Sequence, residues 1–167
     1  MVNKEEIEFL KESNAIESEY SKEALDDAIK AWDYAKKLKF NVPYNVKPKD
    51  IASIHKVLIK RLNPRIAGRF RKVQVGVMTR DGFKEAIHWT EIEDELNMLC
   101  NPGLNPYYLG EEQIKQWHIK FEHVHPFEDG NGRVGRILMN LQRIKASLPL
   151  LIIHEGLEQA KYYHWFK

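Results

Sequence analysis

The regular spacing of apolar residues constrains the fold of this chain more than any other feature of its sequence. Apolar side chains recur every three or four positions along five stretches, which is the pattern of helices with one buried face. These stretches are residues 21–39, 49–61, 92–99, 114–121 and 137–144, and a last helix is expected from about residue 155 to the C-terminus. Proline and glycine place connectors at residues 41–48 and 101–110. The 167 residues suffice for one domain with its own core.

Residues 73–88 break the helical pattern. Valines alternate with other residues from Val73 to Val77, and Asp81-Gly82 is a strong turn pair, so this segment is expected to form a β-hairpin. A single hairpin in a helical domain must lean on helices for stability. Its free edge could accept an extended peptide by strand addition, and the alternative is a loop without a role.

Composition and charge exclude several classes of protein. The formal net charge is only +2, which gives no general reason to bind nucleic acid. Cys100 is the one cysteine and cannot form an internal disulfide, which favours a reducing compartment. No apolar run approaches the roughly 20 residues that span a bilayer, and the N-terminus is too charged for a secretory signal. We therefore expect a cytoplasmic protein that binds neither nucleic acid nor a membrane.

The segment HPFEDGNGRVGR at residues 125–136 carries the chemistry. The run Gly130-Asn131-Gly132 cannot lie in the middle of a helix, but the helical period resumes after Gly132, so a glycine-bearing loop leads into a helix N-terminus. Free backbone N–H groups make such an end an anion site. Arg133 and Arg136 share one helix face there and oppose the helix dipole. Because guanidinium groups suit phosphate oxygens, a bound polyphosphate would resolve this conflict.

Three further residues of the segment complete the predicted site. Asp129 is a carboxylate beside the anion loop, and Mg²⁺ takes one or two carboxylates together with phosphates and waters. His125 can accept a proton near neutral pH, which suits activation of a hydroxyl. Phe127 is expected to point into the core as an anchor. Each residue alone is ordinary, but together they indicate an enzyme that handles nucleotides.

The segment resembles the signature of the Fic (filamentation induced by cAMP) domain at every position. The sequence IAGRFR at residues 66–71, followed by VQV, resembles the lead-in to that family's flap, and the similarity covers most of residues 50–165. The resemblance implies a single all-α domain over residues 1–167, with about seven helices and one β-hairpin flap at residues 73–88. It also implies a protein adenylyltransferase, which moves AMP from ATP onto a Ser, Thr or Tyr hydroxyl of a target protein and releases pyrophosphate.

The resemblance assigns a role to each residue of the segment. His125 would be the general base, and Asp129 would hold Mg²⁺ against the α- and β-phosphates of ATP. Arg133 would bind the β- or γ-phosphate, and Arg136 would orient the γ-phosphate. The anion cradle would consist of Gly130, Asn131 and Gly132.

Two further elements are implied by the resemblance. The flap would clamp the target segment by main-chain pairing along Val75, Gly76, Val77 and Met78. Tyr162 and Tyr163 would wall the pocket for the nucleotide base, and the alternative is a core stripe.

Residues 13–18, SNAIES, resemble the family's inhibitory pattern Ser/Thr-x-x-x-Glu-Gly/Asn, on a helix expected at residues 10–20. Glu17, with Ser13, would then pair with Arg136 and withdraw it from the γ-phosphate. Ser18 departs from the pattern, which has Gly or Asn at that position. The alternative is an exposed helix with a solvated Glu17.

Other functions fit parts of the same pattern. Related folds transfer UMP, phosphocholine or phosphate, and Glu17 could position a water for removal of AMP. A nucleotide-binding module without catalysis has no need of His125, and a zinc site at His123 and His125 lacks further ligands. The expected partner is a target protein docked along the flap, self-modification is a further expectation, and the oligomeric state is left open.

Overall fold

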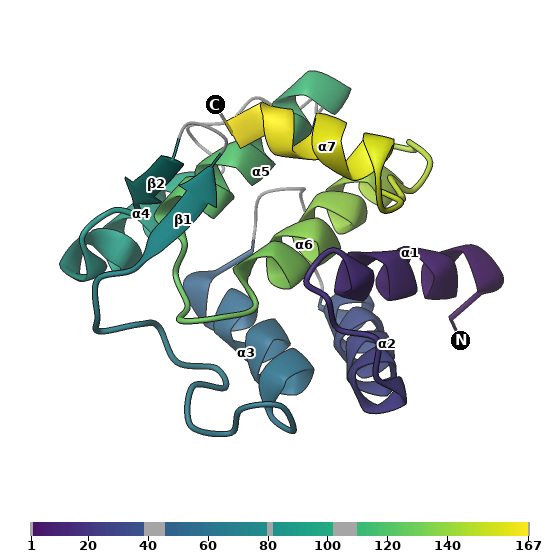
Figure 1. The fold of residues 1–167 in the computed structure, drawn as a ribbon, viewed down its shortest axis with the longest axis horizontal. Coiled ribbons are helices and arrows are strands. Elements are labelled where there is room, and N and C mark those ends of the chain that lie inside the picture. Colours follow the sequence, from purple (N-terminus) through teal and green to yellow (C-terminus); the bar gives the residue numbers. More distant parts are fainter. Residues whose placement is uncertain (1, 39–45, 80–81, 102–109, 167) are drawn as a thin grey trace.

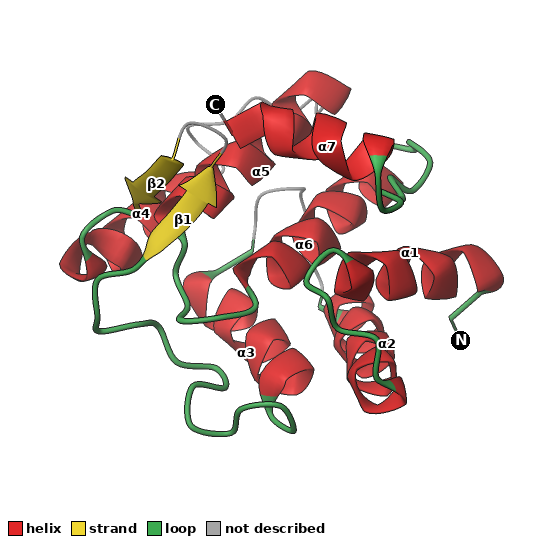
Figure 2. Cartoon of the chain, viewed as in Figure 1, coloured by secondary structure: helices red, strands yellow, loops and turns green. Residues whose placement is uncertain are grey.

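The computed structural model describes residues 2–38, 46–79, 82–101 and 110–166, and these residues form a helical domain with one small sheet (Figures 1 and 2). The α-helices within these ranges are α1 Lys4–Ala15, α2 Lys22–Lys37, α3 Pro48–Ile59, α4 Ile92–Leu99, α5 Glu111–Val124, α6 Asn131–Lys145 and α7 Leu157–Tyr163. Two short 3₁₀ helices are η1 Trp89–Glu91 and η3 His164–Phe166, and the strands are β1 Gly76–Thr79 and β2 Gly82–Glu85. The predicted all-α class with one hairpin is confirmed.

Helix α6 is the central element of the fold. It crosses the middle of the molecule and packs against α5 on one side and α2 and α3 on the other (Figure 1). Most of its side chains are buried, including polar ones such as Arg133, Arg136 and Asn140. A helix buried on all sides normally carries apolar residues. The polar side chains on α6 therefore have a purpose other than core packing.

The N-terminal helix differs from its expected position at residues 10–20. It begins at Lys4, because Asn3 and Glu6 form a capping box in which each side chain accepts a hydrogen bond from the other residue's backbone N–H. It ends at Ala15, and Ser18 takes a left-handed φ of 58° in the turn that follows. Glu17 thus lies in a turn after the helix rather than on it.

Other boundaries differ from the sequence prediction by a few residues. Pro48 opens α3 instead of ending a connector, since proline suits the first turn of a helix. Helix α6 begins at Asn131, before the point where the apolar period resumes, and Ile144 is 44% exposed rather than part of the buried stripe. The remainder of the connectors expected at residues 41–48 and 101–110 lies largely outside the described residues.

The hairpin is shorter than the predicted 73–88. Strands β1 and β2 pair antiparallel, with Gly76 opposite Glu85 and Thr79 opposite Gly82, and the Ala86 N–H adds one bond to the Val75 carbonyl. Gly82 has a φ of 110°, which favours glycine, while its turn partner Asp81 lies outside the described residues. The hairpin stands at the edge of the molecule, where all four residues of β2 are exposed (Figure 2).

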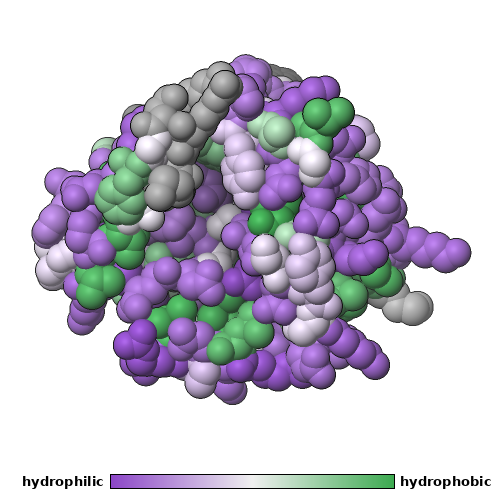
Figure 3. Space-filling model, in the orientation of Figure 1, coloured by the Kyte–Doolittle hydropathy of each residue, from purple (hydrophilic) through white to green (hydrophobic). Residues whose placement is uncertain are grey.

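Polar residues cover most of the face seen in Figure 3, and apolar residues gather there only in small groups. Within the described ranges, no helix is both long enough and apolar enough to cross a membrane.

Candidate active site

Two left-handed residues turn the chain from α5 into α6. His125 ends α5 with φ 49° and ψ 61°, a conformation that few residues other than glycine adopt. Gly130 precedes α6 with φ 80°, and a Cβ there would lie 2.8 Å from Ile59 Cδ1. Glycine is therefore required at position 130 by both backbone angle and space. The loop between these two residues presents its polar groups at the N-terminus of α6.

The loop is held in shape from within. The Asn131 side chain accepts a hydrogen bond from the Phe127 N–H at 2.8 Å and donates one to the Phe127 carbonyl at 2.9 Å. Phe127 is fully buried, and its ring stacks on His55 with the ring centres 3.8 Å apart. The predicted anchoring role of Phe127 is confirmed. Because the Asn131 side chain is committed to the loop, that residue can offer only its backbone N–H to an anion.

His55 of α3 supports the loop from below, and sequence analysis missed it. The Gly68 N–H lies 2.9 Å from His55 Nδ1, and His55 Nε2 lies 3.0 Å from the Asp129 carbonyl. An N–H can only donate and a carbonyl can only accept, so Nε2 carries the proton. Burial lowers the pKa of His55 to about 4, which keeps the ring neutral. The only signal in the sequence is its place on the apolar face of residues 51–59.

His125 has the environment of a general base. Its ring is partly buried, and Nδ1 lies 3.3 Å from the Glu122 carbonyl, which requires the proton on Nδ1 and leaves the lone pair on Nε2. Burial lowers the pKa of His125, and the charge of Arg71 acts in the same direction. The imidazole is therefore neutral at physiological pH and able to accept a proton.

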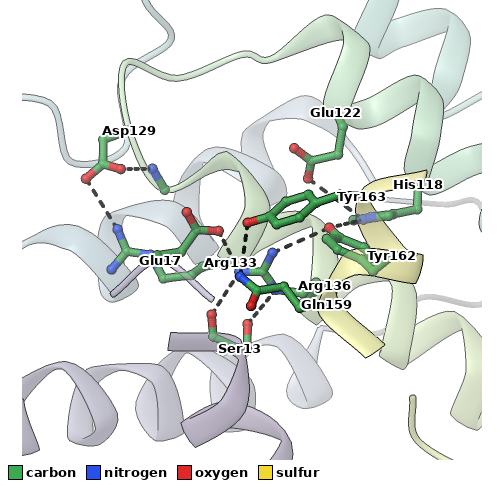
Figure 4. Close-up of polar contacts among 11 residues, drawn as sticks. Ser13, Glu17, His118, Glu122, Asp129, Arg133, Arg136, Gln159, Tyr162 and Tyr163 are labelled. Carbon is green, nitrogen blue, oxygen red and sulfur yellow. Dashed lines mark hydrogen bonds and ion pairs between the residues drawn. The ribbon is translucent and has the colours of Figure 1, made fainter. Parts of the chain in front are cut away.

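Arg136 is buried at the junction of α6, α1 and α7 (Figure 4). Its Nε donates to Ser13 Oγ at 2.9 Å, and its Nη2 donates to the Ser13 carbonyl at 2.8 Å and to Glu17 Oε1 at 2.7 Å. Its Nη1 lies 3.4 Å from the Tyr162 hydroxyl. Burial opposes the charged form, but the Tyr162 and Glu17 oxygens outweigh it and raise the pKa of Arg136. The contact between Glu17 and Arg136, expected from the resemblance, is present.

The Glu17 carboxylate lies over the first turn of α6. A Cβ added to Gly132 would collide with Glu17 Oε1 and would lie 2.8 Å from Arg136 Nη1. The first N–H groups of a helix have no partner within the helix and attract anions. In this structure a carboxylate of the same chain occupies the neighbourhood in which sequence analysis placed a phosphate.

Asp129 and Arg133 line the outer part of the same helix end. Asp129 is exposed, accepts a hydrogen bond from the Gly130 N–H, and lies 3.3 Å from Arg133 Nη2. Arg133 is buried, and its Nε has no hydrogen-bond partner among the described residues. A buried cationic donor without a partner is costly and suits a site that receives an anionic ligand.

The described residues do not bring together a full set of metal ligands. No group of three or more His, Cys, Asp or Glu side chains comes together in the described part of the chain, and His123 is exposed on α5. Asp129 is nevertheless an accessible carboxylate beside the anion site, and Mg²⁺ commonly binds through one such carboxylate, phosphates and waters. The donor set fits Mg²⁺ only when it arrives with phosphate.

The two tyrosines of α7 do different things. Tyr162 is buried, and its hydroxyl lies 2.8 Å from His118 Nε2 and near Arg136. Tyr163 is 50% exposed. Burial favours the core alternative for Tyr162, so only Tyr163 is placed to meet a ligand from solvent.

Two titratable residues of α5 lie behind Arg136 and were not predicted as part of the site. Gly135 lacks a Cβ, which leaves space for the Glu122 carboxyl and the His118 ring against α6. Burial raises the pKa of Glu122 to about 8 and lowers the pKa of His118 to about 3. Glu122 Oε1 is buried without a hydrogen-bond partner among the described residues. Both groups are therefore neutral, or nearly so, at neutral pH.

The fold and the site together define a helical domain in which a loop joins a neutral histidine to a helix N-terminus with two buried arginines. The family model for the Fic/DOC family matches residues 45–142, and the chain belongs to this family. It is 34% identical over 122 residues to the protein adenylyltransferase Fic of Drosophila willistoni and, over the same length, to that of Drosophila melanogaster. The match covers 71% of this chain and 24% of each relative, so the chain spans about a quarter of their length.

Solved structures share the fold. A Fic family protein from Desulfovibrio desulfuricans G20 superposes with a TM-score of 0.73 at 20% identity, covering 96% of this chain and 53% of that one. A Fic domain containing signaling protein from Bacteroides thetaiotaomicron gives a TM-score of 0.77 at 19% identity, covering 95% and 69% of the two chains. At this level of identity the similarity concerns the fold alone.

Proposed function

We propose that this chain is a protein adenylyltransferase that transfers AMP from ATP to a Ser, Thr or Tyr hydroxyl of a target protein. The observation that supports this proposal most is the arrangement of the loop. The neutral His125 lies at one end, and two buried arginines, Arg133 and Arg136, lie at the other. A partnerless N–H on Arg133 supports an anionic co-substrate. The name of the Drosophila relatives supports ATP as the donor of AMP.

In the proposed reaction, His125 Nε2 accepts the proton of the target hydroxyl while the hydroxyl oxygen attacks the α-phosphorus. The bond from that phosphorus to the oxygen bridging to the β-phosphate breaks, and pyrophosphate leaves. Arg133 and the backbone N–H groups of residues 131 and 132 bind the phosphate oxygens, while the Gly130 N–H stays bonded to Asp129. Asp129 would hold Mg²⁺, which neutralises phosphate charge when bound. Positioning and charge neutralisation account for most catalysis of this kind.

The target segment would pair with the hairpin, along the backbone of residues 75–78. Such strand addition uses main-chain hydrogen bonds and tolerates many sequences. The exposed Tyr163 of α7 would contact the nucleotide base.

The same proposal includes a brake on the enzyme. Glu17 holds Arg136 away from the γ-phosphate, so bound ATP adopts a pose in which the α-phosphorus is not aligned with the attacking hydroxyl. Small misplacements of reacting groups cost about 10²-fold in rate. The ion pair of 2.7 Å and the burial of Arg136 support this step.

Labelled ATP tests the proposal directly. The Glu17→Gly variant is incubated with ATP labelled at the α- or the γ-phosphate, and protein-bound label is counted. We expect label from the α position only, and about 10²-fold more than with the unaltered chain. Glu19→Gly is the matched control, because Glu19 lies in the same turn but accepts its hydrogen bond from the Ser21 N–H.

Each other outcome selects a different function. Transfer of the γ label would indicate phosphorylation, and label from UTP in preference to ATP would indicate UMP transfer. Release of AMP from a modified protein by the unaltered chain would indicate the reverse reaction. Binding of ATP without transfer of any group in Glu17→Gly would leave a nucleotide-binding module and overturn the proposal.

A further inference from the structure

Arg71 is a buried arginine that bonds only to backbone carbonyls. Its side chain is among the largest fully buried side chains of the protein, and this burial lowers the pKa of Arg71. Its Nη1 donates to the Val73 carbonyl at 2.9 Å, and its Nη2 donates to the Ile87 carbonyl at 2.7 Å. Its Nε donates to the carbonyl of His125 at 2.7 Å. The guanidinium therefore joins three separate segments of the chain.

No carboxylate forms an ion pair with Arg71 in the described ranges of the chain. A buried charge that meets only neutral acceptors adds little to stability compared with an apolar side chain of the same volume. A guanidinium, however, carries its N–H donors in a fixed planar fork. It can therefore hold several carbonyls at set positions. Its position here is explained by geometry rather than by stability.

The three segments are the two ends of the hairpin, called its feet here, at residues 73–75 and 86–88, and the loop at residues 125–130 between α5 and α6, called the catalytic loop. Val73 precedes β1 and Ile87 follows β2, while His125 carries the proposed base. Arg71 also bonds the loop a second time, through its backbone N–H to the Pro126 carbonyl at 2.9 Å, and its Nη2 reaches the Val124 carbonyl at 3.3 Å. Among the described residues, every hydrogen bond between the feet of the hairpin and the catalytic loop passes through Arg71.

Apart from Ala86 and Ile87, which pack at its base, the described side chains of the hairpin add few contacts. All four residues of β2 are exposed, and Phe83 lies against Gly76 of the opposite strand. His125 itself holds a left-handed conformation that few residues other than glycine adopt, and a hydrogen bond to its carbonyl helps to fix it. Both the hairpin and the base therefore depend on the same guanidinium.

We infer that Arg71 is a positioning residue that sets the distance between the docked target segment on the hairpin and His125. This inference rests on the proposed function, because it concerns the acceptor side of the same site. Arg71 touches neither the reacting atoms nor the phosphate cradle. Its loss should therefore lower the rate of transfer to protein without changing the binding of ATP.

The test replaces Arg71 by lysine, which keeps the charge but cannot span three carbonyls. The matched control is Arg143→Lys. Arg143 is also buried and donates to a carbonyl, that of Pro149. It differs from Arg71 in that it also donates to the Glu111 carboxylate at 2.7 Å and lies at the far end of α6. Both changes are made in the unaltered chain for hydrogen exchange and in the Glu17→Gly background for kinetics.

In Arg71→Lys we expect faster amide exchange across residues 73–88 and unchanged exchange in α2 and α6. In the kinetic arm we expect kcat for self-modification to fall about 10²-fold, with KM for ATP changed less than about threefold. We expect Arg143→Lys to lower the melting temperature about as much as Arg71→Lys does. It should nevertheless change neither the amide exchange of the hairpin nor kcat.

Two results would overturn the inference: hairpin exchange and kcat that match the parent, or losses no greater than those of Arg143→Lys. If the Glu17→Gly parent transfers nothing, the proposed function has failed, while the exchange arm still decides whether Arg71 anchors the hairpin.

Discussion

The two ends of the catalytic loop are built in opposite ways. At the α6 end, Arg136 is 2% exposed and donates hydrogen bonds to α1, α7 and the turn that follows α1. At the α5 end, His125 faces a two-stranded hairpin that is exposed and tied to the loop by one arginine, Arg71. Local stability follows the density of buried contacts, so the α6 end is the more rigid.

This difference matches what each end would recognise under the proposed function. A triphosphate has one shape and charge, and a rigid, buried set of donors would bind it with little reorganisation. A protein segment varies in side chains but not in backbone, and an exposed strand edge pairs with any of them. The rigid end is also where the proposed brake would act, because a single carboxylate, Glu17, contacts an arginine that further hydrogen bonds hold in place.

The largest effect on the rate of transfer is expected from replacing the proposed base, His125. His125→Ala should lower transfer by about 10²- to 10⁴-fold, because a positioned general base contributes that much. ATP affinity should stay the same, since the rigid phosphate end is untouched. Transfer and ATP binding are measured in the Glu17→Gly background, and His123→Ala is the control on the same helix, where His123 is exposed. Equal rates in the two variants would mean that His125 takes no part in the reaction.

A second, smaller effect is expected at the phosphate end. Asp129→Asn should raise the Mg²⁺ concentration at half-maximal rate by about tenfold, because the carboxylate is the proposed protein ligand. Rates are measured over a Mg²⁺ titration. Glu128→Gln is the control, since Glu128 is the adjacent carboxylate and pairs with the exposed Arg65. A Mg²⁺ dependence shared by both variants would contradict the assignment of Asp129.

The two ends also differ in how far sequence alone could predict them. The loop, the presence of a helix after it and the burial of Phe127 follow from local rules about glycine, proline and apolar spacing, and they were predicted. The helix itself begins at Asn131, earlier than expected. The Glu17–Arg136 contact joins residues 119 positions apart, and no local rule links them. It was expected only through resemblance to a family, and the helix bounds that came with it were wrong.

The supporting residues could not be predicted for a related reason. His55 lies on an apolar helix face and Arg71 in a basic stretch, and each pattern is ordinary in sequence. Their roles depend on which carbonyls the folded chain brings within reach. Glu122 is similar, because its raised pKa arises from space that Gly135 leaves on a neighbouring helix. Sequence predicts what a segment prefers locally, whereas these roles arise from tertiary packing.

The third prediction concerns the pH dependence of the rigid end. Glu122 has its pKa raised to about 8 by burial, so the folded protein binds a proton that the unfolded chain releases near pH 4.5. Stability must then fall as pH rises through this window, and the loss is complete only above pH 8. The melting temperature of the parent should therefore fall between pH 7 and 9, where the buried histidines are neutral in both states.

Glu122→Gln should flatten that slope, because an amide has no proton to release. Glu112→Gln, an exposed position on the same helix, should keep the slope of the parent. If the melting temperature falls with the same slope against pH in all three proteins, Glu122 is ionised in the folded state at neutral pH.

The smallest effect is expected in the turn that carries Glu17. Ser18 is exposed and has a φ of 58°, where serine is strained and asparagine is tolerated, so Ser18→Asn should stabilise the fold by about 0.5 kcal/mol. Ser147→Asn is a matched control, because Ser147 has a φ of 57° in the turn after α6, away from the brake. Both variants should melt about 1–2 °C higher than the parent.

Only Ser18→Asn should also lower the residual self-modification of the unaltered chain, because a more stable turn keeps Glu17 on Arg136 for more of the time. If Ser147→Asn lowers it equally, the effect is one of global stability. If neither variant lowers it, the turn does not limit release of the brake, and escape of Arg136 must instead depend on its contacts with Ser13 and Tyr162.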